Sequence, residues 1–140
     1  MALWRELMRH HAPLDPQYDL VPGAAAAWRV HLAGLLGGAS GAVFVSGEEG
    51  APGAFCSVEL RPAPPLLSEP GRAEITDLFV SPALRRNGCG RALVEAALVW
   101  IRERGIARVE VRVVAANRDG QAFWRALGWG DFVDVLQRRL

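Results

Sequence analysis

The chain has 140 residues, of which 51% are hydrophobic, and a formal net charge of +1 at pH 7. This size is sufficient for one buried core, so we expect a single domain over residues 1–140. The near-neutral charge gives no electrostatic reason to expect nucleic acid or a membrane surface as the main partner. Cys56 and Cys89 show no metal-ligand spacing and suggest no disulfide framework, which is typical of the reducing cytoplasm.

Hydrophobic periodicity predicts two N-terminal helices, over residues 2–11 and about 23–36, joined by a proline-rich link. A strand is expected at Val43–Val45, with an antiparallel partner over Ala54–Leu60. The segment from Arg61 to Gly71 contains four prolines and is expected to form a loop.

The second half of the chain alternates strands and helices. We expect strands over 73–80, Arg108–Val114 and about 132–138, and helices near 88–104 and 119–127. Together with the first half, this order predicts one layered α/β domain, with a mixed sheet between helices.

The turn after the 73–80 strand carries the most specific signal, Arg85-Arg86-Asn87-Gly88-Cys89-Gly90-Arg91. Its two glycines allow consecutive N–H groups to point into one concavity, and the following helix adds the positive end of its dipole. With three arginines nearby, the turn is predicted to bind a multiply charged anion such as a pyrophosphate. The alternative is an ordinary strand-to-helix connection.

Two well-known phosphate loops do not match this turn. The chain has no lysine for a P-loop, and Leu93 stands where a dinucleotide-binding fragment needs its third glycine. What remains is Arg-x-x-Gly-x-Gly, formed by Arg85, Gly88 and Gly90.

This Arg-x-x-Gly-x-Gly turn resembles the acyl-CoA pyrophosphate loop of the GCN5-related N-acetyltransferase (GNAT) superfamily. The surrounding order is similar too: the Ala73-Glu74-Ile75 strand, a long helix, Asn117, a short helix, and Leu127-Gly128-Trp129 where the family has Leu-Gly-Phe. The resemblance implies an α/β fold with a mixed, mostly antiparallel central sheet, splayed between two strands, and helices on both faces. It also implies acetyl-CoA as cofactor and transfer of its acetyl group to a primary amine of a small molecule or peptide.

One part of the family pattern is missing. Members usually begin with a strand, whereas this chain begins at the first helix, so either the first strand is missing or another segment covers the gap. A missing strand would leave Val43–Val45 as an exposed edge, so we expect a homodimer.

The resemblance assigns the acetyl-CoA site to two segments. The pyrophosphate falls to the turn, residues Arg85, Arg86, Asn87, Gly88, Cys89, Gly90 and Arg91. The pantetheine arm falls to backbone groups of Leu78, Phe79 and Val80, where that strand splays from the Arg108–Val114 strand. Asn117 is either a helix cap or a pantetheine contact, or both.

Acetyl transfer also needs a base for the amine. Glu74 matches the glutamate base of histone-type members, and strand alternation places it with Thr76, Leu78 and Val80, whose mostly apolar character would raise its pKa. The alternative is a satisfied strand glutamate. Asp77 falls on the opposite face unless a bulge reverses it, and Glu59 is a third candidate.

Trp124 stands where many members have the tyrosine that protonates the departing thiolate, and an indole cannot titrate in this range. Trp124 either hydrogen-bonds the sulfur while water or the substrate supplies the proton, or another hydroxyl such as that of Tyr18 takes this role. The remaining alternative is a catalytically weak acyl-CoA-binding or regulatory module. A covalent role of Cys89 is not favoured, because the resembled family usually has an aliphatic residue at this position and cysteine is often a buried small hydrophobe.

Acceptor selection is expected from the N-terminal helices, their loop and the final strands. Asp15 and Asp131 are candidates to attract an ammonium group, and Tyr18 to stack on it. The alternative is solvated carboxylates and a packed tyrosine. The histidines, His10, His11 and His31, show no metal-binding pattern and are interpreted as helix-surface residues.

Overall fold

The computed structural model describes residues 1–66, 68, 71–138 and 140. Its helices are α1 (Ala2–His11), α2 (Ala24–Gly37), α3 (Cys89–Arg102) and α4 (Arg118–Ala126). Its strands are β1 (Gly41–Glu48), β2 (Ala51–Pro62), β3 (Gly71–Val80) and β4 (Val109–Val111). Two short 3₁₀ turns, η1 (Pro16–Tyr18) and η2 (Pro82–Leu84), follow α1 and β3.

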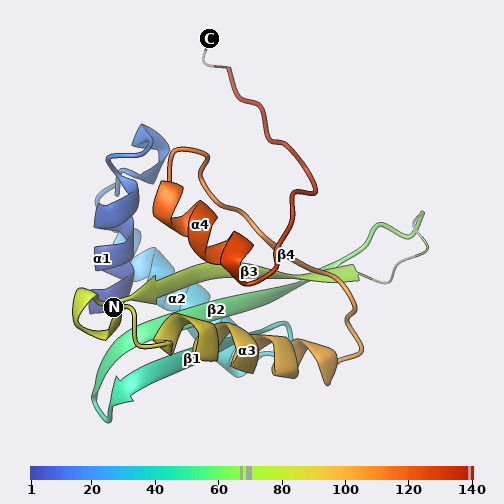
Figure 1. Ribbon diagram of the computed structural model, residues 1–140, viewed down its shortest axis with the longest axis horizontal. Coiled ribbons are helices and arrows are strands. Elements are labelled where there is room, and N and C mark those ends of the chain that lie inside the picture. Colours follow the sequence, from blue (N-terminus) through green and yellow to red (C-terminus); the bar gives the residue numbers. More distant parts are fainter. Residues whose placement is uncertain (67, 69–70, 139) are drawn as a thin grey trace.

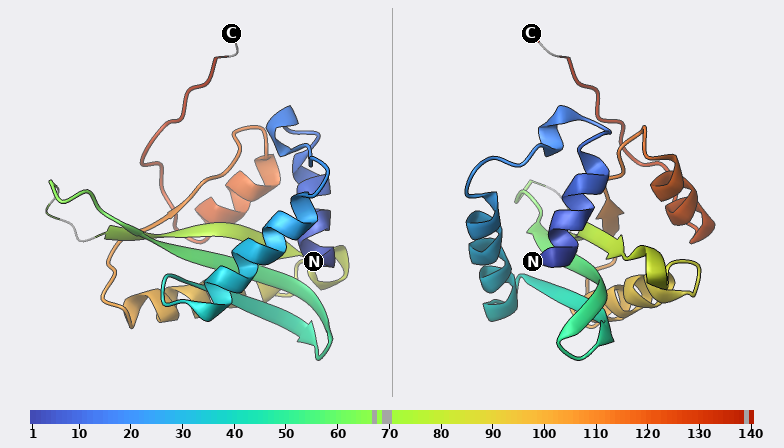
Figure 2. Two further views of the ribbon diagram at one scale, coloured as in Figure 1. Left: turned by 180° about the vertical axis from the view of Figure 1, so that it is seen from behind. Right: turned by 90° about the vertical axis from the view of Figure 1, so that its left-hand side faces the viewer.

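The four strands form one sheet in the order β1-β2-β3-β4. The first two pairs are antiparallel and the last, β3 with β4, is parallel. Helices α1 and α2 cover one face and α3 the other, as Figures 1 and 2 show. The predicted α/β architecture, with a mixed and mostly antiparallel sheet between helices, is confirmed.

Each face of the sheet has its own core. On the α3 side, the amphipathic stripe of that helix (Leu93, Val94, Ala97 and Ile101) packs on residues of β2 and β3. On the other side, Trp4 and Leu7 of α1 pack on Phe55 and Phe79. The two cores hold β2 and β3 between helices, which fixes the faces on which their polar side chains emerge.

A β-bulge interrupts the pairing of β2 with β3. Ser57 pairs with Asp77 and Val58 with Ile75, so Thr76 is an extra residue in β3. The bulge shifts the alternation by one, and Asp77 and Phe79 therefore share the α1 side of the sheet with Glu74. The expectation that Leu78 and Val80 share the face of Glu74 is wrong, since both pack toward the α3 core.

The predicted final strand at 132–138 is also wrong. These residues have no regular secondary structure and extend away from the sheet (Figure 1). Phe132, Val133, Val135 and Leu136 are 67–93% exposed. The adjacent β4 pairs over only three residues and leaves no long ladder for this segment to join, and a strand without a partner is not stable.

The helix boundaries agree with expectation to within two residues, whereas several strands differ in length. The Arg108–Val114 strand is shorter, Val109–Val111, and β1 extends over Gly41–Glu48 as an edge of the sheet. Within the predicted loop 61–71, residues 67, 69 and 70 lie outside the described residues. None of the helices in the described parts of the chain combines the length and apolar composition that a membrane span requires.

Candidate active site

The parallel pair β3–β4 opens after three residues. Ala73, Glu74 and Ile75 pair with Val109, Glu110 and Val111, and no pairing follows although β3 continues to Val80. The opening begins at the Thr76 bulge, where the strand twists away from its neighbour. Along Leu78–Val80, the side of β3 that faces β4 pairs with no described strand, and apart from the Val80 carbonyl, which accepts Arg85 Nε, it is available to an extended ligand that completes the ladder.

The turn after β3 presents the N-terminus of α3 at the same end of the strand. Gly88 has a left-handed φ of 78°, and a Cβ at this position would meet nothing within 4 Å, so glycine is favoured there by conformation alone. The first helical hydrogen bond runs from Ala92 N–H to the Gly88 carbonyl at 3.0 Å. The N–H groups of Cys89, Gly90 and Arg91 precede it and have no intrahelical acceptor, which is the arrangement that binds anions.

At Gly90, glycine is favoured by close neighbouring side chains and not by the backbone conformation. A Cβ there would lie 3.3 Å from the Phe123 ring and 3.5 Å from Val80 Cγ2. The missing side chain therefore allows α3, α4 and the end of β3 to meet at one point.

The arginines of the turn have different surroundings. Arg85 donates from Nε to the Val80 carbonyl at 2.9 Å, which ties the turn to the end of β3. Arg86 has a positive φ of 66°, unusual for a residue with a side chain. Such backbone strain is often found at ligand-binding turns. Arg86, Asn87 and Arg91 are exposed.

On the face covered by α1 and α2, paired side chains of β2 and β3 form three rows across the sheet. They are Phe55 with Phe79, Ser57 with Asp77, and Glu59 with Glu74. The first row is apolar and belongs to the core with Trp4 and Leu7. The next two rows are polar and lie at the level where β3 and β4 separate.

Ion pairs occupy the third row. Glu59 accepts Arg61 at 2.8 Å and His31 at 3.2 Å. Glu74 is paired with Arg61 at 3.1 Å and with Arg112 at 3.5 Å. The expected apolar surroundings of Glu74 are therefore wrong, because two guanidinium groups flank its carboxylate.

The middle row is a hydrogen-bonded group of hydroxyls and one carboxylate. Ser57, only 1% exposed, donates to Asp77 Oδ2 at 2.7 Å, and its Oγ lies 2.8 Å from Thr76 Oγ1. Burial raises the pKa of Asp77, while Ser57, His31, His11 and Thr76 act in the opposite direction. Asp77 thus stands on the same face as Glu74, which is the outcome that a bulge makes possible.

Two histidines reach this face. His31 is exposed on α2, as the sequence-based interpretation has it, whereas that interpretation is wrong for His11, which is partly buried. His31 contacts Glu59, and the Nδ1 atom of His11 is buried with no hydrogen-bond partner in the described structure. The His11 ring lies 5.0 Å from that of Tyr18, measured between centroids. Burial lowers the pKa of His11, as does the neighbouring His10, while the charge of Asp77 opposes them.

Trp124 is 7% exposed and belongs to the α3-side core. Its ring makes edge contacts with Phe123 at 5.2 Å and Trp129 at 4.9 Å between centroids. Asn117 caps α4, because its Oδ1 accepts the Gly120 N–H at 3.0 Å. The capping interpretation of Asn117 is confirmed, and this leaves its amide nitrogen for other contacts.

The two cysteines are free and differ in environment. Cys56 is buried, and burial raises the pKa of its thiol to about 12, with a further contribution from Asp77. It therefore stays protonated at neutral pH and is a poor nucleophile. Cys89 is partly buried against the α3-side core, as expected for a small hydrophobe.

The predicted acceptor residues do not gather at one point. Asp15 caps η1 by accepting the Gln17 N–H at 2.9 Å and also accepts Gln137 Nε2 at 3.2 Å. Asp131 forms a two-point ion pair with Arg125, which lowers the pKa of this exposed carboxylate. Only Tyr18, beside His11, is near the polar rows.

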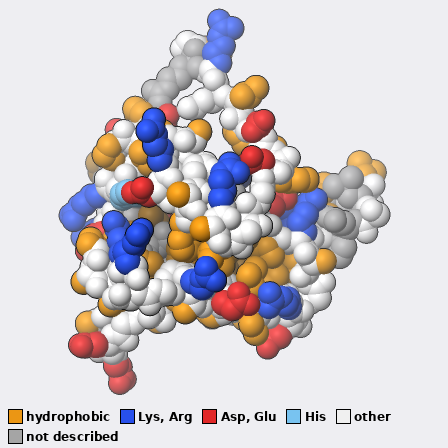
Figure 3. All heavy atoms as spheres, in the orientation of Figure 1, with side chains coloured by type: hydrophobic (Ala, Val, Ile, Leu, Met, Phe, Trp, Pro, Cys, Tyr) orange, Lys and Arg blue, Asp and Glu red, His pale blue; other side chains and the backbone are white. Residues whose placement is uncertain are grey.

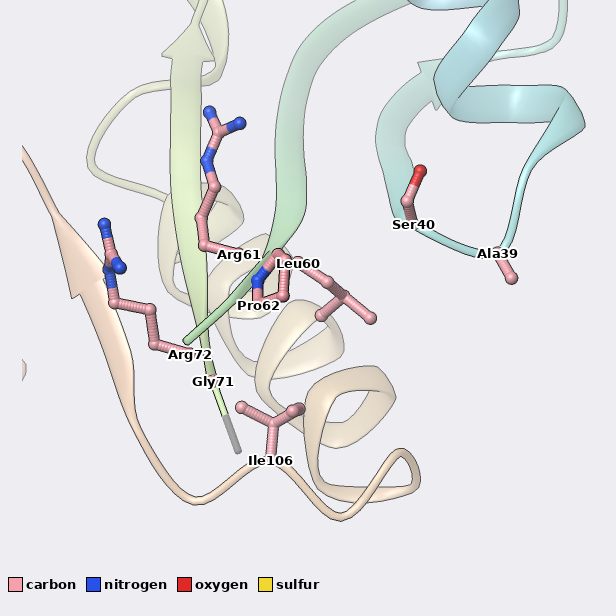
Figure 4. A pocket seen from close by; sticks show the side chains of 8 residues that line it. All are labelled: Ala39, Ser40, Leu60, Arg61, Pro62, Gly71, Arg72 and Ile106. Atoms are coloured by element: carbon pink, nitrogen blue, oxygen red, sulfur yellow. The ribbon is translucent and has the colours of Figure 1, made fainter. Parts of the chain in front are cut away.

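The surface beyond these rows offers less. A pocket of about 400 Å³ lies at the opposite end of β3, lined by Leu60, Gly71 and Ile106 among others, with Arg61 and Arg72 pointing away from Ile106 (Figure 4). Figure 3 shows arginine side chains spread singly over one face with acidic ones between them, and not one basic patch. The described residues bring together no three His, Cys, Asp or Glu side chains suited to a metal ion.

Comparison with known proteins gives a family and a fold. A model of the acetyltransferase (GNAT) family matches residues 4–129. An uncharacterised N-acetyltransferase of Methanocaldococcus jannaschii is 37% identical over 57 residues, which are 41% of this chain and 25% of that relative. This chain thus matches about a quarter of the length of that relative.

Two solved structures illustrate the fold. A tetramutant of the BH1408 protein from Bacillus halodurans has a TM-score of 0.82 at 19% identity, over 99% of this chain and 90% of that chain. The AAC(6')-Iy protein in complex with the bisubstrate analog CoA-S-monomethyl-acetylneamine has a TM-score of 0.74 at 20% identity, with the same coverages of 99% and 90%.

Proposed function

The chain belongs to the acetyltransferase (GNAT) family, and on this premise we propose that it transfers the acetyl group of acetyl-CoA to a primary amine of a small molecule or peptide. The amine attacks directly, in a ternary complex. A single domain over residues 1–140 carries this activity. Free thiols at Cys56 and Cys89 support a cytoplasmic location.

The observation that carries this proposal is the opening of β3 from β4 beside the N-terminus of α3. An extended pantetheine arm fits the unpaired side of β3 along Leu78–Val80, since its amides can take the place of a neighbouring strand. The N–H groups of Cys89, Gly90 and Arg91 then suit the pyrophosphate. The residues present therefore fit acetyl-CoA, which supplies the activated acetyl thioester.

The turn arginines divide their work in this proposal. Arg86 and Arg91, which are exposed, pair with phosphate oxygens. Arg85 keeps its bond to the Val80 carbonyl and holds the turn against β3. Asn117 caps α4 and directs its remaining amide donor toward the pantetheine.

The acceptor amine approaches from the α1–α2 side, where the polar rows lie. Of the three candidate carboxylates, Glu59 and Glu74 already have arginine partners. Asp77 is held by hydroxyl groups instead and stands where the strands separate. We therefore favour Asp77 over Glu74 as the carboxylate that assists deprotonation of the amine. Tyr18 then lies at the edge of the amine site.

Small-molecule amines are the favoured acceptor class. The solved AAC(6')-Iy complex contains a conjugate of CoA with an acetylneamine group. A catalytically weak acyl-CoA-binding module is the second candidate, because Trp124 replaces the expected tyrosine and is packed between Phe123 and Trp129.

Two measurements test the proposal. Calorimetry with CoA reports binding, and free-thiol release from acetyl-CoA with a panel of amines (neamine, spermidine and an unblocked peptide) reports turnover. Binding with turnover supports the enzyme, and binding without turnover supports the binding module. The absence of both contradicts both.

A matched pair of variants on α3 locates the donor site. Arg91→Gln removes a cation from the first turn and is expected to weaken CoA binding about tenfold, the equivalent of a charge-assisted hydrogen bond. Arg102→Gln, at the other end of the helix, is the control and leaves the affinity unchanged. Equal effects of the two substitutions contradict a site at the N-terminus.

We also propose a homodimer that pairs through β1. This strand is an edge, eight residues long with its single charged residue, Glu48, at the end. Val45 on it is 63% exposed, beside an apolar groove of about 380 Å³ lined by Met1, Trp28 and Val43 among others. Long apolar edge strands invite pairing. A monomer at high concentration in sedimentation equilibrium contradicts the dimer.

A further inference from the structure

The last turn of α1 carries a histidine on the side that faces the sheet. Trp4, Leu7 and His11 follow at spacings of three and four residues, so they lie on one face of the helix. Trp4 and Leu7 pack on Phe55 and Phe79 of the first row. His11 therefore faces the sheet too, one helical turn beyond Leu7.

One turn of α1 and two residues of the strands that it covers span similar distances. One helical turn rises about 5.4 Å, and two residues of a strand span about 6.7 Å. One turn beyond Leu7 thus corresponds to one row beyond Phe55–Phe79, which is the row of Ser57 and Asp77. The charge of Asp77 acts on the pKa of His11, which agrees with this placement.

The ring of His11 is enclosed by groups from several elements. Tyr18 of η1 lies 5.0 Å from it and His10 of its own helix 5.8 Å, both between ring centroids. The charge of Asp77 on β3 raises the pKa of His11, and the charge of His31 on α2 lowers the pKa of Asp77. Within this enclosure Nδ1 is buried and has no hydrogen-bond partner in the described structure.

A buried imidazole nitrogen without a partner is unusual, because buried polar atoms are nearly always hydrogen-bonded. The lowered pKa of His11 keeps its ring neutral near pH 7, so one nitrogen carries a lone pair. The row below it lies where β3 and β4 separate, the level at which the acetyl group of the donor is expected. In the proposed complex, the ring and the acetyl group would therefore lie at the same level of the sheet.

We propose that His11 is a catalytic residue, the acceptor of the proton that the incoming ammonium must lose, and that Asp77 stabilises the imidazolium that forms. This inference rests on the proposed acetyl transfer. Loss of the proton frees the nitrogen lone pair, which forms the C–N bond with the acetyl carbon while the C–S bond breaks and its electron pair leaves on sulfur. The second nitrogen proton passes to the sulfur through water, and the imidazolium returns its proton to solvent.

Ser57 completes the arrangement as a positioning residue. Its hydroxyl donates to one oxygen of Asp77, which fixes the carboxylate and leaves its negative charge to face the histidine. His11 is then the base, Asp77 is its charged partner, and Ser57 holds Asp77 in place.

The experiment compares His11→Gln with His10→Gln, in acetyl-CoA turnover with the amine panel across pH 5–9. Glutamine keeps polarity and size but does not titrate, and His10 is the exposed neighbour on the same helix. His11→Gln is expected to lower kcat about 100-fold or more, to leave the KM for acetyl-CoA unchanged, and to remove the acidic limb of the kcat/KM profile. His10→Gln stays within about twofold of the wild type. Added imidazole is expected to restore part of the activity of His11→Ala.

A second readout does not depend on turnover. Because Asp77 raises the pKa of His11, Asp77→Asn is expected to lower it further, seen as a shift of the His11 ring-proton titration in NMR spectra. An active wild type with an equally active His11→Gln and an unchanged acidic limb overturns this inference alone, as does a His11 titration that Asp77→Asn leaves in place. A wild type that releases no thiol with any amine overturns the proposed function together with it.

Discussion

Ser57 and Asp77 are joined across β2 and β3 by a 2.7 Å hydrogen bond that places a partly buried carboxylate where β3 parts from β4. This contact exists because the bulge at Thr76 turns Asp77 to the face of Ser57. It connects the shape of the sheet to the chemistry proposed for it.

Ser57→Ala tests the strength of this contact. The substitution removes one hydrogen-bond donor, Ser57, from a partly buried carboxylate, so the free energy of unfolding is expected to fall by about 1–3 kcal/mol in urea titrations. Ser40→Ala, at an exposed serine, is the control and changes it little. An equal effect of both substitutions means that the hydrogen bond contributes nothing particular.

Asp77→Asn tests the raised pKa of this carboxyl. In the wild type the folded protein binds the Asp77 proton more tightly than the unfolded chain, so stability falls as the pH rises from about 3.9 through the raised pKa. Asparagine does not titrate and lacks this loss. The stability of Asp77→Asn relative to the wild type is therefore expected to increase from pH 3.5 to pH 7 in urea unfolding. A constant difference across this range contradicts the raised pKa.

The two glycines of the turn are expected to respond differently to alanine. Gly88→Ala forces a side chain into a left-handed conformation, at about 1–2 kcal/mol of stability, and distorts the anion-binding turn. Gly90→Ala keeps a helical backbone and only presses on Phe123, so its effect on unfolding is smaller. Urea unfolding and CoA calorimetry on both variants check the order.

Trp124→Tyr restores the hydroxyl that the family pattern has at this position. We expect kcat to be retained or raised, with a stability loss of about 1–2 kcal/mol from the smaller ring in a packed aromatic cluster. Trp129→Tyr, in the same cluster, is the control for packing alone. A large loss of kcat in Trp124→Tyr with unchanged CoA affinity contradicts the view that the indole only assists the leaving sulfur.

Thiol titration tests the two cysteine environments. With its pKa near 12, Cys56 is expected to resist Ellman's reagent at pH 8 in the folded protein, while the partly buried Cys89 reacts. Cys89→Ser then removes the reactive thiol, and denaturant exposes Cys56. Rapid reaction of Cys56 in folded Cys89→Ser contradicts the buried environment.

Much of the fold was predictable because its signals are local. The stripe of α3, the glycine turn after β3 and the asparagine cap of α4 all depend on residues close together in sequence. The resemblance carried by Arg85, Gly88 and Gly90 then pointed to the sheet that the structure has.

The polar rows were less accessible. Strand alternation cannot reveal where an extra residue is inserted, so the sequence leaves the face of Asp77 open and places Glu74 among apolar neighbours. The strand expected at 132–138 failed for a related reason, since alternation shows that a segment suits a strand but not that a partner exists. His11 did carry a signal, because it continues the stripe of Trp4 and Leu7 at helical spacing and so faces the sheet.

The extra residue in β3 also limits how this protein can vary in length. Deleting Thr76 would move every side chain from Asp77 to Val80 to the opposite face of the sheet. Phe79 would then point away from Trp4 and Leu7, and the Asp77 carboxylate would point into the hydrophobic core on the α3 side. A substitution along this strand changes one side chain, whereas a one-residue deletion here would change the side chains on both faces of the sheet together. We therefore expect related sequences to tolerate substitutions around the bulge but to keep the same number of residues there.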